Sequence, residues 1–459
     1  MKFKISFSWL KKIHWSKLWT DKKILSLFII LIIAILCISF ASWRYFQFTQ
    51  EQKPKTTITD NKDIYTEFLV EIFQKIKTNY WEVIKDEDLF KLYQLGTEKL
   101  KHPVTVTIGQ DEKALRSLLT TALGEIPEEK DKKEYAVNLA TIVLYNLQPA
   151  GRSGLFTVQK ETELWNNVKN IDPGTNLYDE IGVKKGANTE EITKAAQMKE
   201  VAVNNLIKNA TNEEEKNKAQ EQLAKVTRAK ETLSLESSRD NYNQYGIEST
   251  VIAEKISNNI LHLWFKKISP STYTELQQVT THFDQFKSLN TLILDLRGNV
   301  GGSIDLLPYL LGPFIGENQY AYEFYHQGKY EPYKTKTGWL PSLVRYKKVV
   351  ILQDDKSQSS AEMMTAVLKK YNIGVVVGTN TRGWGTIEAV FELTNQIDPK
   401  ETYKMFLVHS ITLRDDNQPI EGRGVDPNIK ITDKNWLAQL TEHFNDATIS
   451  AAVSKLLKQ

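Results

Sequence analysis

The longest apolar run of the chain lies near its start. Residues 24–43 are twenty consecutive positions without a charged side chain. A helix of that length spans about 30 Å, the thickness of a bilayer's hydrocarbon core. Trp43 and Tyr45 follow the pattern of an interfacial aromatic anchor, whereas small residues such as Ser39 favour the alternative of a cleaved signal peptide. We predict an uncleaved transmembrane helix, followed by a polar linker at residues 47–62.

Helical spacing of apolar residues marks the next hundred positions. Residues 64–100 and 112–146 both show it. Pro149 and Gly151 then interrupt the pattern. We predict a helical N-terminal domain at residues 63–165.

A second helical unit is predicted at residues 174–246. Its first long helix is preceded by two capping candidates, Asn188 and Thr189, with glutamates directly after them. A charged interval separates this helix from a second one with one apolar face. The pattern predicts a small helical hairpin.

Short buried strands alternate with amphipathic helices from residue 250 onward. The runs TLILDLRG, KKVVILQDD and GVVVGT are strand-like, and SAEMMTAVLKKY between the last two is helical. This alternation is typical of an α/β core with a largely buried sheet. We predict such a core at residues 250–435, followed by a C-terminal helix at residues 436–459.

Charge is distributed unevenly along a chain whose net charge is only +3. Residues 1–23 hold seven lysines and one aspartate, so the remainder is slightly acidic. This argues against nucleic acid as a partner, because nucleic-acid binding needs a basic face on a folded domain. The basic segment is expected to stay cytoplasmic beside anionic lipid, with the bulk of the chain outside the cytoplasm. The single cysteine, Cys37, excludes an intramolecular disulfide and a thiolate metal cluster.

Residues 174–246 resemble a J-domain. NLYDEIGV and ANTEEI are similar to the opening of that family, and the match to its last helices runs without a gap from Leu223 to Gly246. The family's His-Pro-Asp tripeptide, which engages DnaK-type chaperones, is replaced within VAVNNLIKNATN. The resemblance therefore implies a packing or spacer module, and a DnaK-type chaperone is not expected as a partner.

Four motifs in order resemble the catalytic domain of tail-specific, or C-terminal processing, serine proteases. They are LILDLRGNVGG, VVILQDDKSQSSAEMMTAVL, VVVGTNTRGWGTIEAV and SITLRDDNQPIEGRGVDPNI. The resemblance implies an α/β protease core of the ClpP/crotonase-like type, a polypeptide substrate or ligand, and neither a metal nor an organic cofactor. It does not extend to the family's PDZ domain, whose carboxylate-binding pattern is missing between residues 150 and 250. Recognition of C-terminal tails is therefore not expected to follow the family.

The resemblance assigns the nucleophile to Ser359, at a strand-to-helix junction. A hydroxyl near a helix N-terminus lies where backbone N–H groups favour developing negative charge. The glycine loop at residues 299–302 has no side chain at its tip to hinder a substrate carbonyl. The expected oxyanion donors are the amides of Gly301, Gly302 and Ser360.

The general base of the family is missing. Its lysine position falls on Trp384, and the glutamine that orients the lysine becomes Glu388. An indole N–H donates only and cannot accept the serine proton. No lysine lies between Tyr371 and Lys400, so a shift in register does not restore the base. Three residues are candidates for a substitute base, the histidines in combination with a glutamate: Lys356, His262 and His409.

Two functions stay open on the sequence alone. One is a membrane-anchored serine endopeptidase that hydrolyses peptide bonds through Ser359. The other is a catalytically inactive homologue that acts as an extracytoplasmic peptide-binding or scaffold protein.

Overall fold

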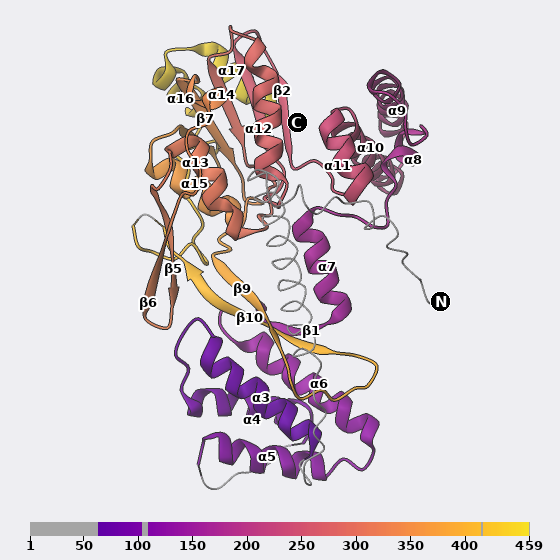
Figure 1. The fold of residues 1–459 in the computed structure, drawn as a ribbon, viewed down its shortest axis with the longest axis vertical. Helices are drawn as coiled ribbons and strands as arrows, with labels where there is room; N and C mark the ends of the chain where they lie inside the picture. The colour runs from indigo at the N-terminus through magenta and orange to yellow at the C-terminus, as the bar shows by residue number, and fades with distance from the viewer. Residues whose placement is uncertain (1–62, 103–108, 415, 459) are drawn as a thin grey trace, which may run out of the picture. The chain divides into compact units, whose positions relative to one another are not determined.

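The computed structural model of the chain describes residues 63–102, 109–414 and 416–458. The basic segment, the predicted transmembrane helix at residues 24–43 and the linker lie outside the described residues. Within the described ranges, no helix combines the length and the apolar character needed to cross a bilayer. Figure 1 shows the order of the elements along the chain.

Four helices form the first part of the described chain: α3 (Ile64–Asn79), α4 (Asp86–Lys99), α5 (Glu112–Gly124) and α6 (Glu129–Asn146). Aspartates cap two of them, because the side chains of Asp63 and Asp111 accept backbone N–H groups of the first turn. Apolar faces at the predicted spacing meet in one core, in which Phe68 is fully buried. Met405 and Leu407 from strand β10 (Tyr403–Thr412) belong to the same core, so these helices pack directly against a sheet.

The next helices are α7 (Val158–Lys169), α8 (Leu177–Ile181), α9 (Thr189–Asn209), α10 (Glu213–Leu233) and α11 (Glu236–Tyr245). Helix α7 continues past the boundary that the sequence suggested at residue 165. The long helices α9 and α10 form the predicted hairpin, and Asn188 is the cap of α9, accepting the Glu191 N–H at 2.9 Å. We call α8–α11 the helical insert. Its relation to J-domains stays a prediction.

A six-stranded sheet forms the centre of the α/β core. Its strands are β2 (Val251–Lys255), β3 (Ile260–Phe265), β4 (Thr291–Asp295), β7 (Lys348–Gln353), β8 (Val375–Gly378) and β11 (Ile429–Lys430). They lie in the order β11-β8-β7-β4-β3-β2, and all neighbours are parallel except β2 and β3. The predicted α/β core is thereby confirmed, whereas its closer likeness to ClpP/crotonase-like enzymes stays a prediction.

Side chains that alternate along the strands reach two separate cores. On one face, Leu292 and Leu294 pack with helices α12 (Thr272–His282), α13 (Leu307–Ile315) and α15 (Ser360–Lys370). On the other face, Ile293 packs against the two C-terminal helices. Burial on both faces explains why these strands read as continuous apolar runs.

A five-stranded antiparallel sheet joins the core to the N-terminal helices. Its strands are β1 (Gly154–Thr157), β5 (Tyr320–His326), β6 (Lys329–Lys334), β9 (Thr386–Glu392) and β10 (Tyr403–Thr412). Strand β10 pairs with β1, β5 and β9, and Figure 1 shows it extending to α3 and α6. The short elements are α14 (Pro341–Val344) and the 3-10 turns Phe283–Gln285 and Ile304–Leu306.

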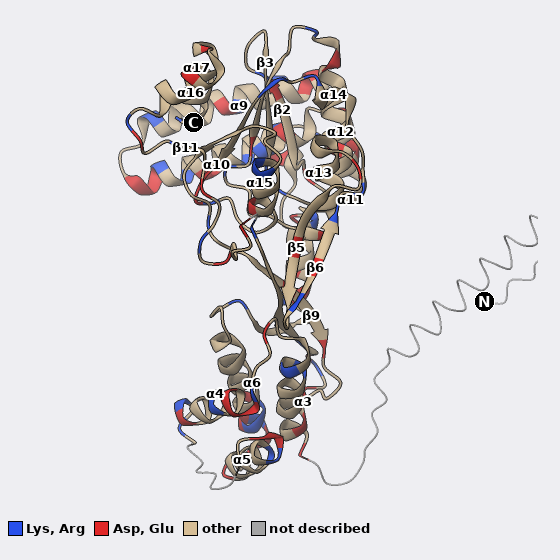
Figure 2. Ribbon diagram, turned by 90° about the vertical axis from the view of Figure 1, so that its left-hand side faces the viewer, with Lys and Arg blue, Asp and Glu red and all other residues tan. Residues whose placement is uncertain are grey.

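The C-terminal segment differs from the prediction of a single helix. It forms α16 (Trp436–Phe444) and α17 (Ala447–Leu456). Asn445 ends α16 in a left-handed conformation, and the Asp446 side chain caps α17. These two residues are favourable stop and start signals, which explains the break. On the side drawn in Figure 2, basic and acidic residues are interspersed over α4, α5 and α6.

Candidate active site

Ser359 lies between strand β7 and helix α15 in a strained backbone conformation. Its φ of 58° and ψ of −128° are in a region that non-glycine residues rarely occupy. As the residue before the first turn of α15, it stands at the positive end of the helix dipole. This sharp strand-to-helix turn is a geometry that presents a nucleophile.

The glycine loop rests directly on Ser359. A Cβ added to Gly301 would lie 2.8 Å from the Ser359 Cβ and 2.8 Å from the Gln358 carbonyl oxygen. The Gln358 N–H donates to the Asn299 carbonyl at 2.9 Å, which ties the two loops together. The structure therefore brings the sequence-predicted serine and glycine loop into contact, with no room for a side chain between them.

Two of the three expected oxyanion donors are available. The Gly301 N–H donates to Asn299 Oδ1 at 2.8 Å, so this amide is already used, contrary to the expectation from the sequence. Gly302 N–H has no hydrogen-bond acceptor within the described ranges. Ser360 is the first residue of α15, so its N–H has no partner within the helix. Gly302 and Ser360 are thus the two predicted oxyanion donors whose N–H groups have no partner among the described residues, and their role stays a prediction.

Glu362 binds the serine loop to the loop that carries Trp384. One of its carboxylate oxygens accepts the N–H groups of Ser359 at 2.8 Å and of Trp384 at 2.7 Å. The other oxygen accepts the Thr381 hydroxyl at 2.5 Å and the Gly383 N–H at 2.7 Å. Burial raises the pKa of the Glu362 carboxyl, and these hydrogen bonds oppose that rise. Because Ser359 and Trp384 share one acceptor atom, their backbones lie side by side.

The side chain of Trp384 forms a polar pair of its own. Its Nε1–H donates to Glu388 Oε1 at 3.2 Å, and the Thr386 hydroxyl donates to the same oxygen at 2.6 Å. Burial raises the pKa of the Glu388 carboxyl, against the effect of these two donors. The residue at the expected base position is therefore a hydrogen-bond donor engaged with a carboxylate.

Arg152, which lies in the N-terminal part of the chain, stacks on the indole ring of Trp384. Its guanidinium carbon lies 3.3 Å from the centre of the indole ring, a stacked cation–π contact. The same guanidinium pairs with Glu421 at 3.0 Å, and Glu421 accepts the Gly385 N–H at 2.8 Å. These contacts hold the indole in place.

Known proteins resemble this part of the chain. Residues 259–431 match the model of peptidase family S41. The chain carries a peptidase S41 domain. The carboxy-terminal processing protease CtpA of Bacillus subtilis is 30% identical over 183 residues, which are 39% of this chain and 37% of that protein. A probable CtpA-like serine protease of Staphylococcus epidermidis is 26% identical over 174 residues, 38% of this chain and 34% of that protein.

The chain matches little more than a third of the length of these curated relatives. Among solved structures, the photosystem II D1 C-terminal processing protease gives a TM-score of 0.47 at 12% identity, covering 81% of this chain and 94% of that one.

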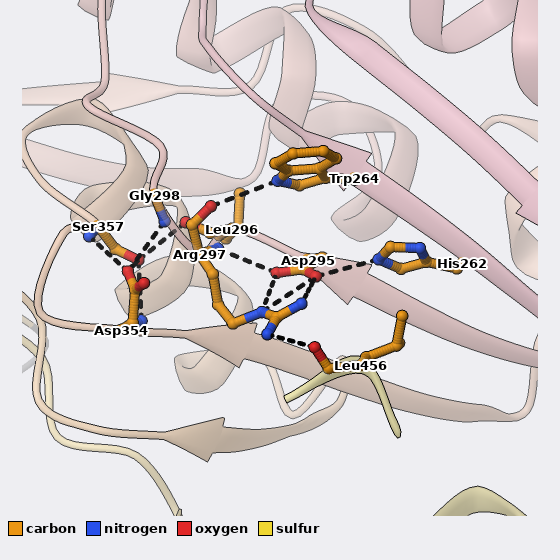
Figure 3. A network of polar contacts seen from close by, with 9 residues as sticks. All are labelled: His262, Trp264, Asp295, Leu296, Arg297, Gly298, Asp354, Ser357 and Leu456. Atoms are coloured by element: carbon orange, nitrogen blue, oxygen red, sulfur yellow. Dashed lines mark hydrogen bonds and ion pairs between the residues drawn. The ribbon is translucent and has the colours of Figure 1, made fainter. Parts of the chain in front are cut away.

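His262 of the S41 domain is engaged away from Ser359. Its Nε2 lies 3.0 Å from Asp295 Oδ2, and Arg297 pairs with the same carboxylate at 2.6 Å (Figure 3). Burial would raise the pKa of Asp295, but the hydrogen bonds from His262 and Arg297 outweigh it and lower this pKa. Arg297 also donates to the Leu456 carbonyl at 2.9 Å, so the network fixes the start of the glycine loop to the C-terminal helix.

The other two candidates for a substitute base, His409 and Lys356, are no better suited to accept the Ser359 proton. His409 stacks on His326 with ring centres 4.2 Å apart, and its Nδ1 bonds to the Ser410 hydroxyl at 2.8 Å. Burial lowers the pKa of His409. Lys356 is exposed, whereas a lysine base needs desolvation. Within the described ranges, none of the three candidates forms a hydrogen bond with Ser359.

Two residues of the site were not singled out from the sequence. Glu362 follows Ser359 at the spacing of a capping box, Ser-x-x-Glu, and this signal could have found it. Arg152 lies far from the motifs in sequence, and no local pattern connects it with Trp384.

Proposed function

We propose that the S41 domain binds polypeptide beside Ser359 without the serine–lysine chemistry of its family. The observation that carries this proposal is the Trp384–Glu388 pair at the base position. A donor already bonded to a carboxylate cannot take up the proton of a serine hydroxyl. Ser359 therefore has its strained turn and the adjoining glycine loop, whereas Trp384 offers it no proton acceptor.

The donor geometry beside Ser359 supports retained peptide binding. The Gly302 and Ser360 amides are directed by a glycine loop and a helix N-terminus, which suit the carbonyl oxygen of a polypeptide. A site that no longer served a function would not need a glycine at position 301. A Cβ added there would collide with Ser359. The proposal thus assigns the chain to the peptide-binding proteins rather than to the hydrolases.

Binding of fluorescein-labelled casein, followed by anisotropy and by gel electrophoresis, tests this function. Gly301→Ala and Gly298→Ala form a matched pair, because both residues have positive φ while only Gly301 lacks space for a Cβ. We expect the wild type to bind casein without cleaving it, Gly301→Ala to lose binding, and Gly298→Ala to retain it. Equal binding by both variants would contradict the proposed site.

A second candidate function is hydrolysis through Ser359 with a proton acceptor supplied by a partner. The retained strain at Ser359 favours it, since such a conformation costs about 1–3 kcal/mol and persists where a mechanism uses it. Casein cleavage that disappears in Ser359→Ala would establish this function in place of the first.

The proposal includes an anchored, extracytoplasmic location, which rests on the sequence of residues 1–43. Alkaline extraction of membranes should leave the chain in the pellet, and protease added to intact cells should degrade the S41 domain. Release by alkali, or protection of the domain until the cells are broken, would overturn this location.

A further inference from the structure

Strand β2 is the outer strand of the six-stranded sheet and, among the strands of the described residues, pairs only with β3. One backbone hydrogen bond lies at each end of the antiparallel pairing between β2 and β3. The Lys266 N–H donates to the Thr250 carbonyl at 2.8 Å, and the Ile256 N–H donates to the Ile260 carbonyl at 3.2 Å. Bonded and non-bonded positions alternate along such a ladder. The odd-numbered residues of β2 therefore direct their N–H and C=O groups away from β3.

Part of this outer edge is covered by the protein itself. The Val251 N–H donates to the buried Glu275 carboxylate at 3.2 Å. Ala253 and Lys255 follow at the next outward positions, and their N–H groups find no acceptor in the described parts of the chain. An edge of this kind is a template for pairing with another extended chain.

A groove of about 490 Å³ runs along this edge. Four consecutive strand residues, 251–254, line it. Because side chains of a strand alternate between the two faces, a groove that touches four in a row follows the edge itself. The helical insert forms the opposite wall through residues including Thr227 and Leu235. Helix α12 contributes Val279, and the 3-10 turn after it contributes Phe283.

The lining is largely apolar and carries one unpaired carboxylate. Its charged residues are three glutamates and one lysine: Glu200, Glu231, Glu254 and Lys230. Lys230 pairs with Glu200 at 2.9 Å and Glu231 pairs with Lys266, whereas Glu254 on β2 is exposed and has no ion pair within the described residues. The hydroxyls of Ser234 and Ser249 are buried in the groove wall without a hydrogen-bond partner. These groups suit a ligand with backbone donors, apolar side chains and positive charge.

We propose that the groove between β2 and the helical insert binds an extended polypeptide segment, in which apolar and basic residues alternate, as a seventh strand of the sheet. The ligand's backbone bonds to Ala253 and Lys255, its apolar side chains enter the groove, and its basic side chains meet Glu254. This site is separate from the Ser359 site and goes beyond the proposed function. It also gives the helical insert a role as one wall of a binding groove.

The test uses the full chain and a fluorescein-labelled peptide of alternating valine and lysine. Ala253→Pro removes the outward N–H without touching the bonds to β3, and proline is tolerated on edge strands. Ala253→Ser is the matched control, because it keeps the N–H. Loss of this bond should weaken binding about tenfold in Ala253→Pro and leave Ala253→Ser near the wild type. Glu254→Lys should weaken the binding of the same valine–lysine peptide. A peptide of alternating valine and glutamate should bind poorly to the wild type.

Two measurements keep the result independent of folding and of the Ser359 site. The same peptide N-methylated at alternate backbone nitrogens should lose binding to the unaltered wild type. Hydrogen exchange should show protection of the Ala253 and Lys255 amides on peptide addition, whereas binding at the Ser359 site would protect Gly302 and Ser360 instead. Wild-type affinity in Ala253→Pro would overturn the proposal. So would protection of the β2 amides before peptide is added, or their burial by pairing between two copies of the chain.

Discussion

The serine side and the predicted base side of the S41 domain's site differ in their chemistry. On the serine side, the strained Ser359 backbone and the closely fitted Gly301 are present, and both restrict the sequence severely. On the base side, the backbone of Trp384 is still bonded to Glu362, but the side chain has the wrong chemistry. We infer that the backbone geometry and the proton-accepting side chain are separable in this site. The buried Glu362 carboxylate would hold the geometry, and residue 384 would decide the chemistry.

The largest effect on activity is expected when the lysine and the glutamine of the family are placed at positions 384 and 388. The double variant Trp384→Lys, Glu388→Gln should cleave fluorescein-labelled casein, which the wild type leaves intact, because a positioned general base contributes about 10²–10⁴-fold to the rate. Adding Ser359→Ala to this variant is the control and should abolish the gain. If the double variant folds but does not cleave casein, the site lacks more than the general base.

The shared carboxylate should carry the largest effect on stability. Glu362→Ala leaves the buried N–H groups of Ser359, Gly383 and Trp384 without an acceptor. Each unpaired buried donor costs about 1–3 kcal/mol, so we expect the free energy of unfolding to fall by about 4 kcal/mol in urea titrations. A loss below about 1 kcal/mol would mean that Glu362 does not hold the two sides together.

The network behind the glycine loop should show a pH-dependent effect. Asp295→Asn should lower the free energy of unfolding by about 3 kcal/mol at neutral pH, because it breaks a buried charged network. The pKa of Asp295 is lowered by folding from its ordinary value of 3.8. The carboxylate therefore stabilises fully above about pH 4, and this stabilisation is lost as the pH falls through the folded pKa. Unfolding curves of both proteins across this range check the sign, and a difference that grows on acidification would contradict it.

The smallest effect is expected at Arg152. Arg152→Ala removes the stacked guanidinium from Trp384 and its pair with Glu421, and should cost about 1–2 kcal/mol of unfolding free energy. Arg152→Lys should recover only part of this loss, because an ammonium cannot reproduce the stacked, planar contact. Full recovery by lysine would show that charge alone holds the indole.

Much of the α/β core followed from local pattern. The buried strands around Leu292 and Val350 are short apolar runs, and their order in the sheet suits the motif order that pointed to Ser359. The contact between Ser359 and Gly301 was expected from the resemblance to tail-specific proteases, which assigns both residues to one site. Of the missed features, only one depends on a tertiary contact: Arg152 reaches Trp384 from another part of the chain and leaves no local signal in the sequence. The Asn299 side chain takes the Gly301 amide two residues further on, a local Asx turn that the Asn-x-Gly spacing could have indicated.

We infer that Ser359 has the backbone geometry of a nucleophile but no general base among the described residues. Intact-mass measurement of the folded wild-type chain after incubation with a fluorophosphonate probe tests it most directly. We predict no mass increase under conditions in which the Trp384→Lys, Glu388→Gln variant is labelled on Ser359. Labelling of wild-type Ser359 at the rate of that variant would contradict the account.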